Sequence, residues 1–88
     1  MSRHAAVNEA VEVTKRLLPS GKVAPKSFRW QGRTYYVVAL GRQWDELTDG
    51  RRIRCFLVQT QGQSSFELRW DATEDEWVLY QAWHADFV

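Results

Sequence analysis

The side chains that could bind a metal in this 88-residue chain are few and scattered. The soft metal ligands are two histidines, His4 and His84, and one cysteine, Cys55. They show neither the C-x-x-C nor the H-x-x-x-H spacing that is typical of structural zinc sites. We therefore expect no metal ion, and we interpret Cys55 as a small buried hydrophobic residue in the middle of a strand.

Groups that could act in catalysis are equally isolated. His84 and Asp86 would point to the same side of a strand, but no serine near them lies in a nucleophile-elbow sequence. The carboxylates of Asp71 and residues 74–76 fall in a polar turn, where water hydrates them, whereas acid–base catalysis needs one desolvated carboxyl group. The glycines form no phosphate-binding loop. We expect neither an enzyme nor a cofactor.

The combination of arginine with aromatic residues is the most informative feature. Such side chains stack on nucleobases and bind phosphates, and they are also enriched at the centres of protein interfaces. We expect six of them on one outward sheet face, as candidate binding residues: Arg29, Tyr36, Arg54, Phe56, Arg69 and Tyr80. The alternative is a second small core, in which the N-terminal segment covers this face and the arginine stems lie over the rings.

The composition limits the class of protein. A chain of 88 residues with 44% hydrophobic and 14% aromatic residues is a single folded domain and not a disordered tail. The longest apolar run, Tyr35–Leu40, is far shorter than the ~20 residues of a membrane helix. The N-terminus lacks the apolar stretch of a secretory signal. A single cysteine forms no disulfide within the chain, so we expect a reducing, cytoplasmic location.

The net charge of +1 conceals a separation of charge along the sequence. Between Val13 and Arg42 there are seven basic residues and no acidic residue, whereas from Asp71 to Val88 there are five acidic residues and no lysine or arginine. A basic surface attracts phosphates or acidic partners only if the fold keeps it apart from the acidic segment. The sequence leaves open whether the two segments neutralise each other.

The elements that must position these residues are predicted to be antiparallel strands. Strand-forming residues flank Gln31-Gly32, which is typical of a two-residue hairpin turn. This turn would place Phe28 opposite Tyr35 and Trp30 opposite Arg33.

Two further hairpins are predicted between residues 53 and 83. Around Gly62, a two-residue or a four-residue loop gives the same register, with Leu57 opposite Leu68. Across the polar stretch 71–76, Leu68 would lie opposite Leu79. The same registers pair Cys55 with Trp70, Gln59 with Phe66, Phe56 with Arg69, Val58 with Glu67, and Glu67 with Tyr80. The predicted inner set is Leu57, Leu68, Trp70, Trp77 and Leu79.

Residues 9–18 are ambiguous between helix and strand, because apolar residues recur there at helical spacing and also alternate. We favour a strand over Val11–Leu17, preceded by a mobile tail of residues 1–10, so that residues 11–88 form a single small β domain. Five or six short antiparallel strands with little or no helix predict a small barrel or rolled sheet, SH3-like or OB-like in size. A closed barrel would leave no unpaired strand edges.

Residues 25–37, PKSFRWQGRTYYV, carry a pattern of the form P-x-x-F-x-W-x-G-R-x-Y-x-V. This pattern, with Trp44, Asp71 and Trp77 further on, resembles a family of small uncharacterised bacterial domains over roughly residues 11–83. Some such domains are similar to neighbours of DNA-repair polymerase genes, which implies a role near nucleic acid. The family has no established activity, so the resemblance implies no catalytic residue. Asp45-Glu46 departs from the family, where further aromatic residues are expected.

Together these features predict a non-enzymatic binding or accessory module. We expect it to bind a protein partner through the arginine and aromatic sheet face. The alternative is an accessory protein that binds single-stranded nucleic acid through the basic stretch 15–42. We expect no membrane association, and the sequence leaves a homodimer open.

Overall fold

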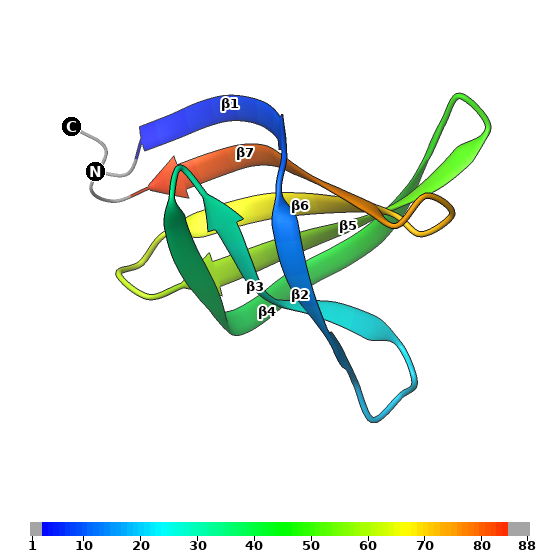
Figure 1. Ribbon diagram of the computed structural model, residues 1–88, viewed down its shortest axis with the longest axis horizontal. Coiled ribbons are helices and arrows are strands. Elements are labelled where there is room, and N and C mark those ends of the chain that lie inside the picture. Colours follow the sequence, from blue (N-terminus) through cyan, green and yellow to red (C-terminus); the bar gives the residue numbers. More distant parts are fainter. Residues whose placement is uncertain (1–2, 85–88) are drawn as a thin grey trace.

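The computed structural model describes residues 3–84, except for the side chains of Arg3 and His84, and these residues form seven antiparallel strands (Figure 1). The strands are β1 (Arg3–Ala10), β2 (Glu12–Leu17), β3 (Val23–Trp30), β4 (Arg33–Thr48), β5 (Arg51–Thr60), β6 (Ser65–Asp71) and β7 (Glu76–His84). They lie in the order β1-β7-β6-β5-β4-β3-β2 in one sheet. Residues 3–84 contain no helix, and so no helix that could cross a membrane.

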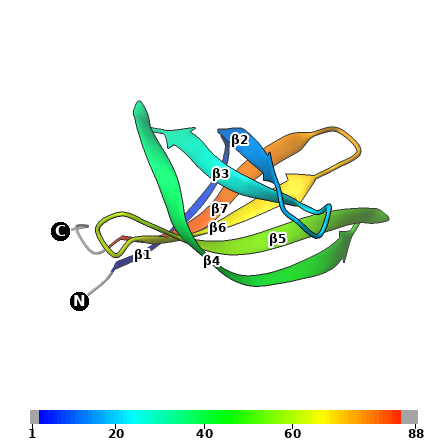
Figure 2. The same cartoon turned by 90° about the horizontal axis from the view of Figure 1, so that it is seen from below.

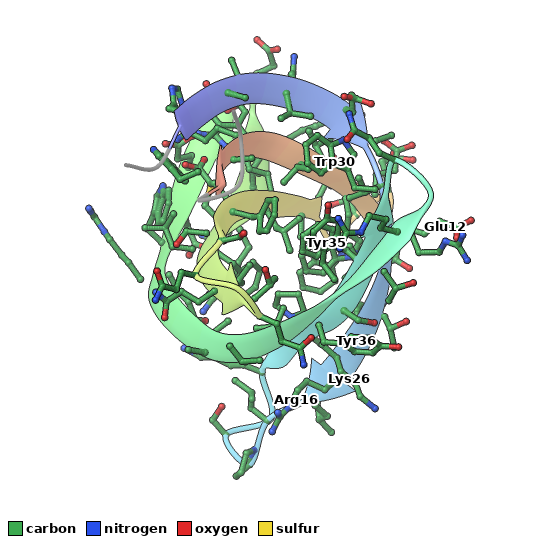
Figure 3. All side chains as sticks on the ribbon, turned by 90° about the vertical axis from the view of Figure 1, so that its left-hand side faces the viewer. Glu12, Arg16, Lys26, Trp30, Tyr35 and Tyr36 are labelled. Atoms are coloured by element: carbon green, nitrogen blue, oxygen red, sulfur yellow. The ribbon has the colours of Figure 1, made fainter. Side chains whose placement is uncertain are left out.

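The prediction of a mainly antiparallel β protein is confirmed, but the sheet is open and is not a closed barrel. Its two edges are β1 and β2, consecutive strands separated only by Val11, and over the described residues β1 pairs with β7 and β2 with β3. The sheet curls around its hydrophobic core without joining these edges (Figures 2 and 3). It also has more strands than the five or six predicted.

The N-terminal segment accounts for part of this difference. Residues 3–10, expected to belong to a mobile tail, form β1 and pair with β7, while residues 1–2 lie outside the described residues. Val7 packs against the core, so burial of an apolar side chain adds to the pairing of β1. The predicted strand over Val11–Leu17 is confirmed as β2, which begins at Glu12.

The first hairpin has the predicted register, with Phe28 opposite Tyr35 and Trp30 opposite Arg33. Gln31 and Gly32 have φ angles of 52° and 74°. Positive φ at both central residues is the geometry of the type I′ turn, whose twist matches that of the flanking strands.

The register predicted for the second hairpin is wrong. Its loop has three residues, 61–63, and is closed by a hydrogen bond of 2.9 Å that the Thr60 N–H donates to the Ser64 carbonyl oxygen. A shift of one residue exchanges the two faces of a strand. The observed partners are Cys55 with Arg69, Phe56 with Leu68, Leu57 with Glu67, Val58 with Phe66, and Gln59 with Ser65. All five pairs predicted between β5 and β6 are therefore wrong.

The third hairpin pairs Leu68 with Leu79, as predicted. The register then shifts between Leu68 and Glu67, so that Glu67 lies opposite Gln81 and not opposite Tyr80. This irregularity is a β-bulge, which inserts an extra residue into one strand.

The core therefore contains residues that the sequence placed outside. Its buried members are Phe28, Trp30, Phe56, Val58, Phe66, Leu68, Trp77, Leu79 and Ala82, with Trp70 packed against them. Leu57, predicted to lie inside, is half-buried on the opposite face, where it pairs with Glu67. The ring centres of Phe28 and Phe66 lie 5.1 Å apart in an edge-to-face arrangement, which stabilises the core beyond simple burial.

β4 exchanges its pairing partner part of the way along its length. Its residues up to Tyr36 pair with β3, whereas those from Val37 onward pair with β5. Figure 2 shows β4 bending away from β3 to run alongside β5. At Gly41 a Cβ atom would lie 3.2 Å from the Leu57 carbonyl oxygen, so a glycine lets the bent strand approach β5 closely.

Candidate binding surface

The six predicted binding residues do not form one surface. Phe56 is fully buried in the core. Arg54 lies beside it, with its guanidinium carbon 5.8 Å from the Phe56 ring centre and a nitrogen 3.5 Å from the Asp45 carboxylate. The other four residues form two separate groups. Arg29 and Tyr36 lie on β3 and β4, whereas Arg69 and Tyr80 lie on β6 and β7.

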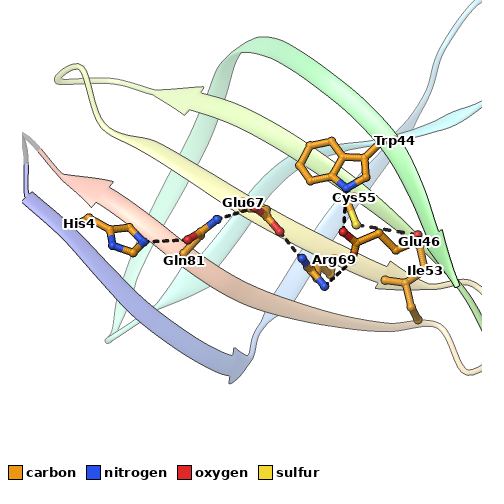
Figure 4. A network of polar contacts seen from close by, with 8 residues as sticks. All are labelled: His4, Trp44, Glu46, Ile53, Cys55, Glu67, Arg69 and Gln81. Atoms are coloured by element: carbon orange, nitrogen blue, oxygen red, sulfur yellow. Dashed lines mark hydrogen bonds and ion pairs between the residues drawn. The ribbon is translucent and has the colours of Figure 1, made fainter. Parts of the chain in front are cut away.

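Arg69 belongs to a polar network with Glu46, Glu67 and Gln81 (Figure 4), and Tyr80 packs against its guanidinium group. The Arg69 guanidinium carbon lies 3.6 Å from the centre of the Tyr80 ring. Its Nε donates a hydrogen bond of 2.7 Å to Glu67, and its Nη1 lies 2.8 Å from the Glu46 carboxylate. Two carboxylates and one ring thus hold this guanidinium in place.

The network continues from Glu67 toward β1. Glu67 is only 3% exposed and also accepts a hydrogen bond of 2.7 Å from the Gln81 amide. The Gln81 amide oxygen lies 2.7 Å from His4 Nε2. Because these groups satisfy one another, and because buried polar groups need such partners, we interpret the network as a structural link between β1, β7, β6 and β4.

Cys55 lies fully buried beside this network, opposite Arg69. Burial raises the pKa of its thiol from the usual 9.0 to about 11, although the positive charge of Arg69 opposes the shift. A thiol that stays protonated at neutral pH is a poor nucleophile. The interpretation of Cys55 as a buried hydrophobic residue is therefore confirmed.

We expect the free energy of unfolding of the wild type to fall, relative to that of a Cys55→Ala variant, as the pH rises from about 9 to about 11. The unfolded thiol loses its proton near pH 9.0, while the folded thiol keeps its proton until about pH 11. The unfolded state therefore binds fewer protons across this range and gains stability. Urea unfolding of both proteins at closely spaced pH values measures the difference, and a constant offset up to pH 11 would contradict the expectation.

The carboxylates between β6 and β7 shape their turn. Asp71 is 8% exposed, accepts hydrogen bonds from the backbone N–H groups of Thr73 and Glu74, and pairs with Arg51 at 2.9 Å. Asp71 is thus not the hydrated loop residue that the sequence predicted. Among the side chains that the structure describes, those of residues 4–83, no three histidine, cysteine, aspartate or glutamate groups lie together as metal ligands. The proposed partners His84 and Asp86 lie, in side chain and in whole respectively, outside the described residues.

Asp75 joins the acidic segment to the basic one. Its carboxylate lies 2.8 Å from Lys15 Nζ and accepts a hydrogen bond of 2.9 Å from the Trp70 indole N–H. The hydrogen bonds from Lys15 and then from Trp70 lower the pKa of Asp75. In the described part of the chain, this is the one ion pair between the segments 13–42 and 71–88.

Most cations of the basic segment are therefore not paired with a carboxylate in the described part of the chain. Within residues 3–84, six of its seven cations form no ion pair: Arg16, Lys22, Lys26, Arg29, Arg33 and Arg42. Among the described residues, the acidic segment therefore neutralises only Lys15 of the basic segment.

Three of these cations share the outer side of β2–β4 with Tyr36. Side chains alternate along a strand, and because Phe28 and Tyr35 point into the core, Arg29 and Tyr36 point outward. Figure 3 shows Tyr36 beside Lys26 and Arg16 on the outside of the ribbon, with Tyr35 on the inside. We call Arg16, Lys26, Arg29 and Tyr36 the basic face. One acidic residue, Glu12, lies opposite Arg29 in the register.

Two hollows lie near Tyr36, which lines the second of them, while the first begins at the next residue, Val37. One, of about 270 Å³, lies between the start of β3 and the middle of β4 and is lined by Arg16 and Lys26. The other, of about 260 Å³, lies between the start of β4 and the β5–β6 turn and is lined by Arg33, Tyr36 and Ser64. Neither Arg16 nor Lys26 was among the predicted site residues, although both belong to the basic stretch 15–42. Alternation alone would place Lys26 on the same side as the inward Phe28. Lys26 is exposed and lies at the register shift between β2 and β3, which the sequence did not predict.

Comparisons with known proteins place the chain in one family. The family model described as "Domain of unknown function (DUF6504)" matches residues 1–84. No curated protein and no solved structure matches the chain.

Proposed function

The chain belongs to this family of domains of unknown function, and from its own surface chemistry we propose that it is a non-enzymatic module that binds single-stranded nucleic acid on the basic face of β2–β4. One observation carries the proposal. Arg16 and Lys26 lie beside an exposed tyrosine, Tyr36, and Arg29 points outward on the same sheet face. Within residues 3–84 none of these three cations has an acidic ion-pair partner.

Nucleic acid suits this surface through both its negative charge and its bases, which can stack on an exposed ring. Lysine and arginine side chains that neutralise phosphates release condensed counterions, which favours binding. An exposed aromatic ring between such cations also offers a stacking partner to a base. A folded protein partner offers fewer regularly spaced negative charges than a phosphate backbone, so the uncompensated cations favour nucleic acid.

The expectation of a protein partner loses the surface on which it depended. Phe56 lies in the core, and Arg69 already pairs with two carboxylates. A protein partner remains our second candidate because of a different feature, an apolar groove of about 530 Å³ beside Gly41, Leu57 and Trp83. Its lining by described residues includes no charged side chain, in contrast to the hollows beside Tyr36.

We expect an Arg29→Gln variant to bind a fluorescently labelled single-stranded oligonucleotide more weakly than the wild type. Loss of one phosphate contact should reduce the slope of log affinity against log salt concentration by about 0.7 in magnitude. Fluorescence anisotropy titrations at several salt concentrations measure both quantities. Lys26→Gln should act in the same direction.

The matched control is Arg52→Gln. Arg52 is also an exposed strand arginine without an ion pair among the described residues, but it lies opposite Leu47 in the β4–β5 hairpin, away from the basic face. The change in net charge is identical, so a purely global charge effect would weaken both variants equally. Equal effects, or no binding by the wild type at low salt, would overturn the proposal.

A further inference from the structure

The exchange of partners by β4 creates an unusual setting for Tyr36. Tyr36 is the last residue of β4 that pairs with β3, and Val37 is the first that pairs with β5. Among the described residues, β4 up to Tyr36 pairs with β3 but not with β5. From Val37 onward it pairs with β5 but not with β3. Each part of β4 therefore has one edge without a neighbouring strand. The two hollows occupy these gaps, so they lie diagonally on either side of Tyr36.

Tyr36 also differs from the other two tyrosines of the chain. The Tyr35 ring stacks on Phe28 with 5.2 Å between the ring centres, and the Tyr80 ring is covered by the Arg69 guanidinium. Tyr36 is 55% exposed, and no ring or cation of the described residues packs on it. It therefore presents ring surface that is not used by the fold.

The two hollows offer different chemistry. The hollow on the β3 side is lined by Arg16 and Lys26, whose positive charges suit a phosphate group. The hollow on the β5 side is lined by Arg33, Ser64 and the backbone of Gly62, which together provide hydrogen-bonding groups. Polar groups of the latter kind suit the edge of a nucleobase.

We propose that Tyr36 is the stacking platform for one unpaired base, with the adjoining phosphate at the Arg16 and Lys26 hollow and the edge of the base at the Arg33 and Ser64 hollow. This inference rests on the proposed function and adds the part of the ligand that is recognised. A duplex keeps its bases stacked inside the helix and offers this surface only its phosphates. The preference for single strands over duplexes therefore comes from Tyr36.

The test compares Tyr36→Ala with Tyr36→Phe and with the control Leu47→Ala. Leu47 is 77% exposed on the same strand but lies opposite Arg52 in the β4–β5 hairpin and lines neither hollow, so its truncation removes exposed apolar surface outside the proposed site. Because one base stacked on an aromatic ring contributes about 1–3 kcal/mol, we expect Tyr36→Ala to lower the affinity for a single-stranded oligonucleotide roughly 5- to 150-fold. Tyr36→Phe and Leu47→Ala should remain within about twofold of the wild type, and circular dichroism should show all three variants folded.

An abasic strand of the same length gives the second measurement, because it keeps every phosphate and has no base to stack. The wild type should bind the abasic strand about as weakly as Tyr36→Ala binds the normal strand, and Tyr36→Ala should not distinguish the two strands. The salt dependence of Tyr36→Ala should equal that of the wild type, since no phosphate contact is removed.

The two proposals fail in different ways. If the wild type binds single strands and Arg29→Gln weakens this binding, but Tyr36→Ala changes the affinity less than about twofold, the stacking inference is wrong and the proposed function stands. If the wild type binds neither the normal nor the abasic strand at low salt, the proposed function is wrong and the inference falls with it. Equal affinity of the wild type for normal and abasic strands overturns the inference alone.

Discussion

Replacement of Phe56 by alanine should lower the free energy of unfolding by about 3–5 kcal/mol. The Phe56 side chain is fully buried, its ring centre lies 5.6 Å from that of Trp77, and its strand partner is the buried Leu68. Truncation would leave a cavity among side chains that cannot collapse to fill it. Because small domains are stable by only about 5–15 kcal/mol, this is a large fraction of the total.

Urea unfolding followed by tryptophan fluorescence measures the loss, with Leu57→Ala as the control. Leu57 is the next residue of β5 and lies half-buried on the opposite face, so its truncation should cost clearly less. The register predicted from the sequence would reverse this order, with Leu57 inside and Phe56 outside. A larger loss for Leu57→Ala than for Phe56→Ala would therefore contradict the observed register.

The second large effect is expected at Arg69. Arg69→Met should lower the free energy of unfolding by about 3–5 kcal/mol, because it leaves the buried Glu67 carboxylate without its cation. It also removes the ion pair with Glu46 and the contact with the Tyr80 ring. Chemical denaturation at neutral pH measures this loss.

A double variant separates loss of packing from loss of charge pairing. Glu67→Gln combined with Arg69→Met removes the buried charge but keeps an amide that can still accept a hydrogen bond from Gln81, so it should recover more than half of the lost stability. The control is Arg54→Met, since the Asp45 carboxylate that Arg54 faces is 43% exposed and such pairs contribute at most about 1 kcal/mol. If Arg69→Met costs no more than Arg54→Met, Glu67 does not depend on its cation.

The hairpins show which parts of this fold can be derived from the sequence. Gln31-Gly32 specifies its own turn type, so the register of the first hairpin and the outward direction of Arg29 and Tyr36 could be predicted. The loop at 61–63 carries no such specification, because loops of two, three or four residues all suit its composition. The loops of two and four residues that were considered have even lengths, which give the same register, whereas the observed loop has three residues and exchanges the two faces. This single difference moved Phe56 from the proposed surface into the core.

Other features depend on contacts between distant parts of the chain. β1 has few strand-forming side chains and is held in place by β7, which lies at the other end of the described chain. The ion pair of Lys15 with Asp75 likewise joins residues 60 positions apart, so the sequence could not show how much of the basic segment keeps its charge. The partner exchange at Tyr36 depends on the bend of β4, for which the sequence offers only Gly41 as a signal.

The arrangement of the two sheet edges has a consequence for the strands next to them. One continuous peptide, residues 3–17, shields both β7 and β3, because its first half caps one end of the strand order and its second half caps the other. Proteolytic nicking near Val11 followed by release of this peptide would bare two rows of hydrogen-bonding groups at once. Such rows are templates for strand swapping between molecules. The edges of β7 and β3 are thus both covered by one stretch of the chain that contains no aromatic residue.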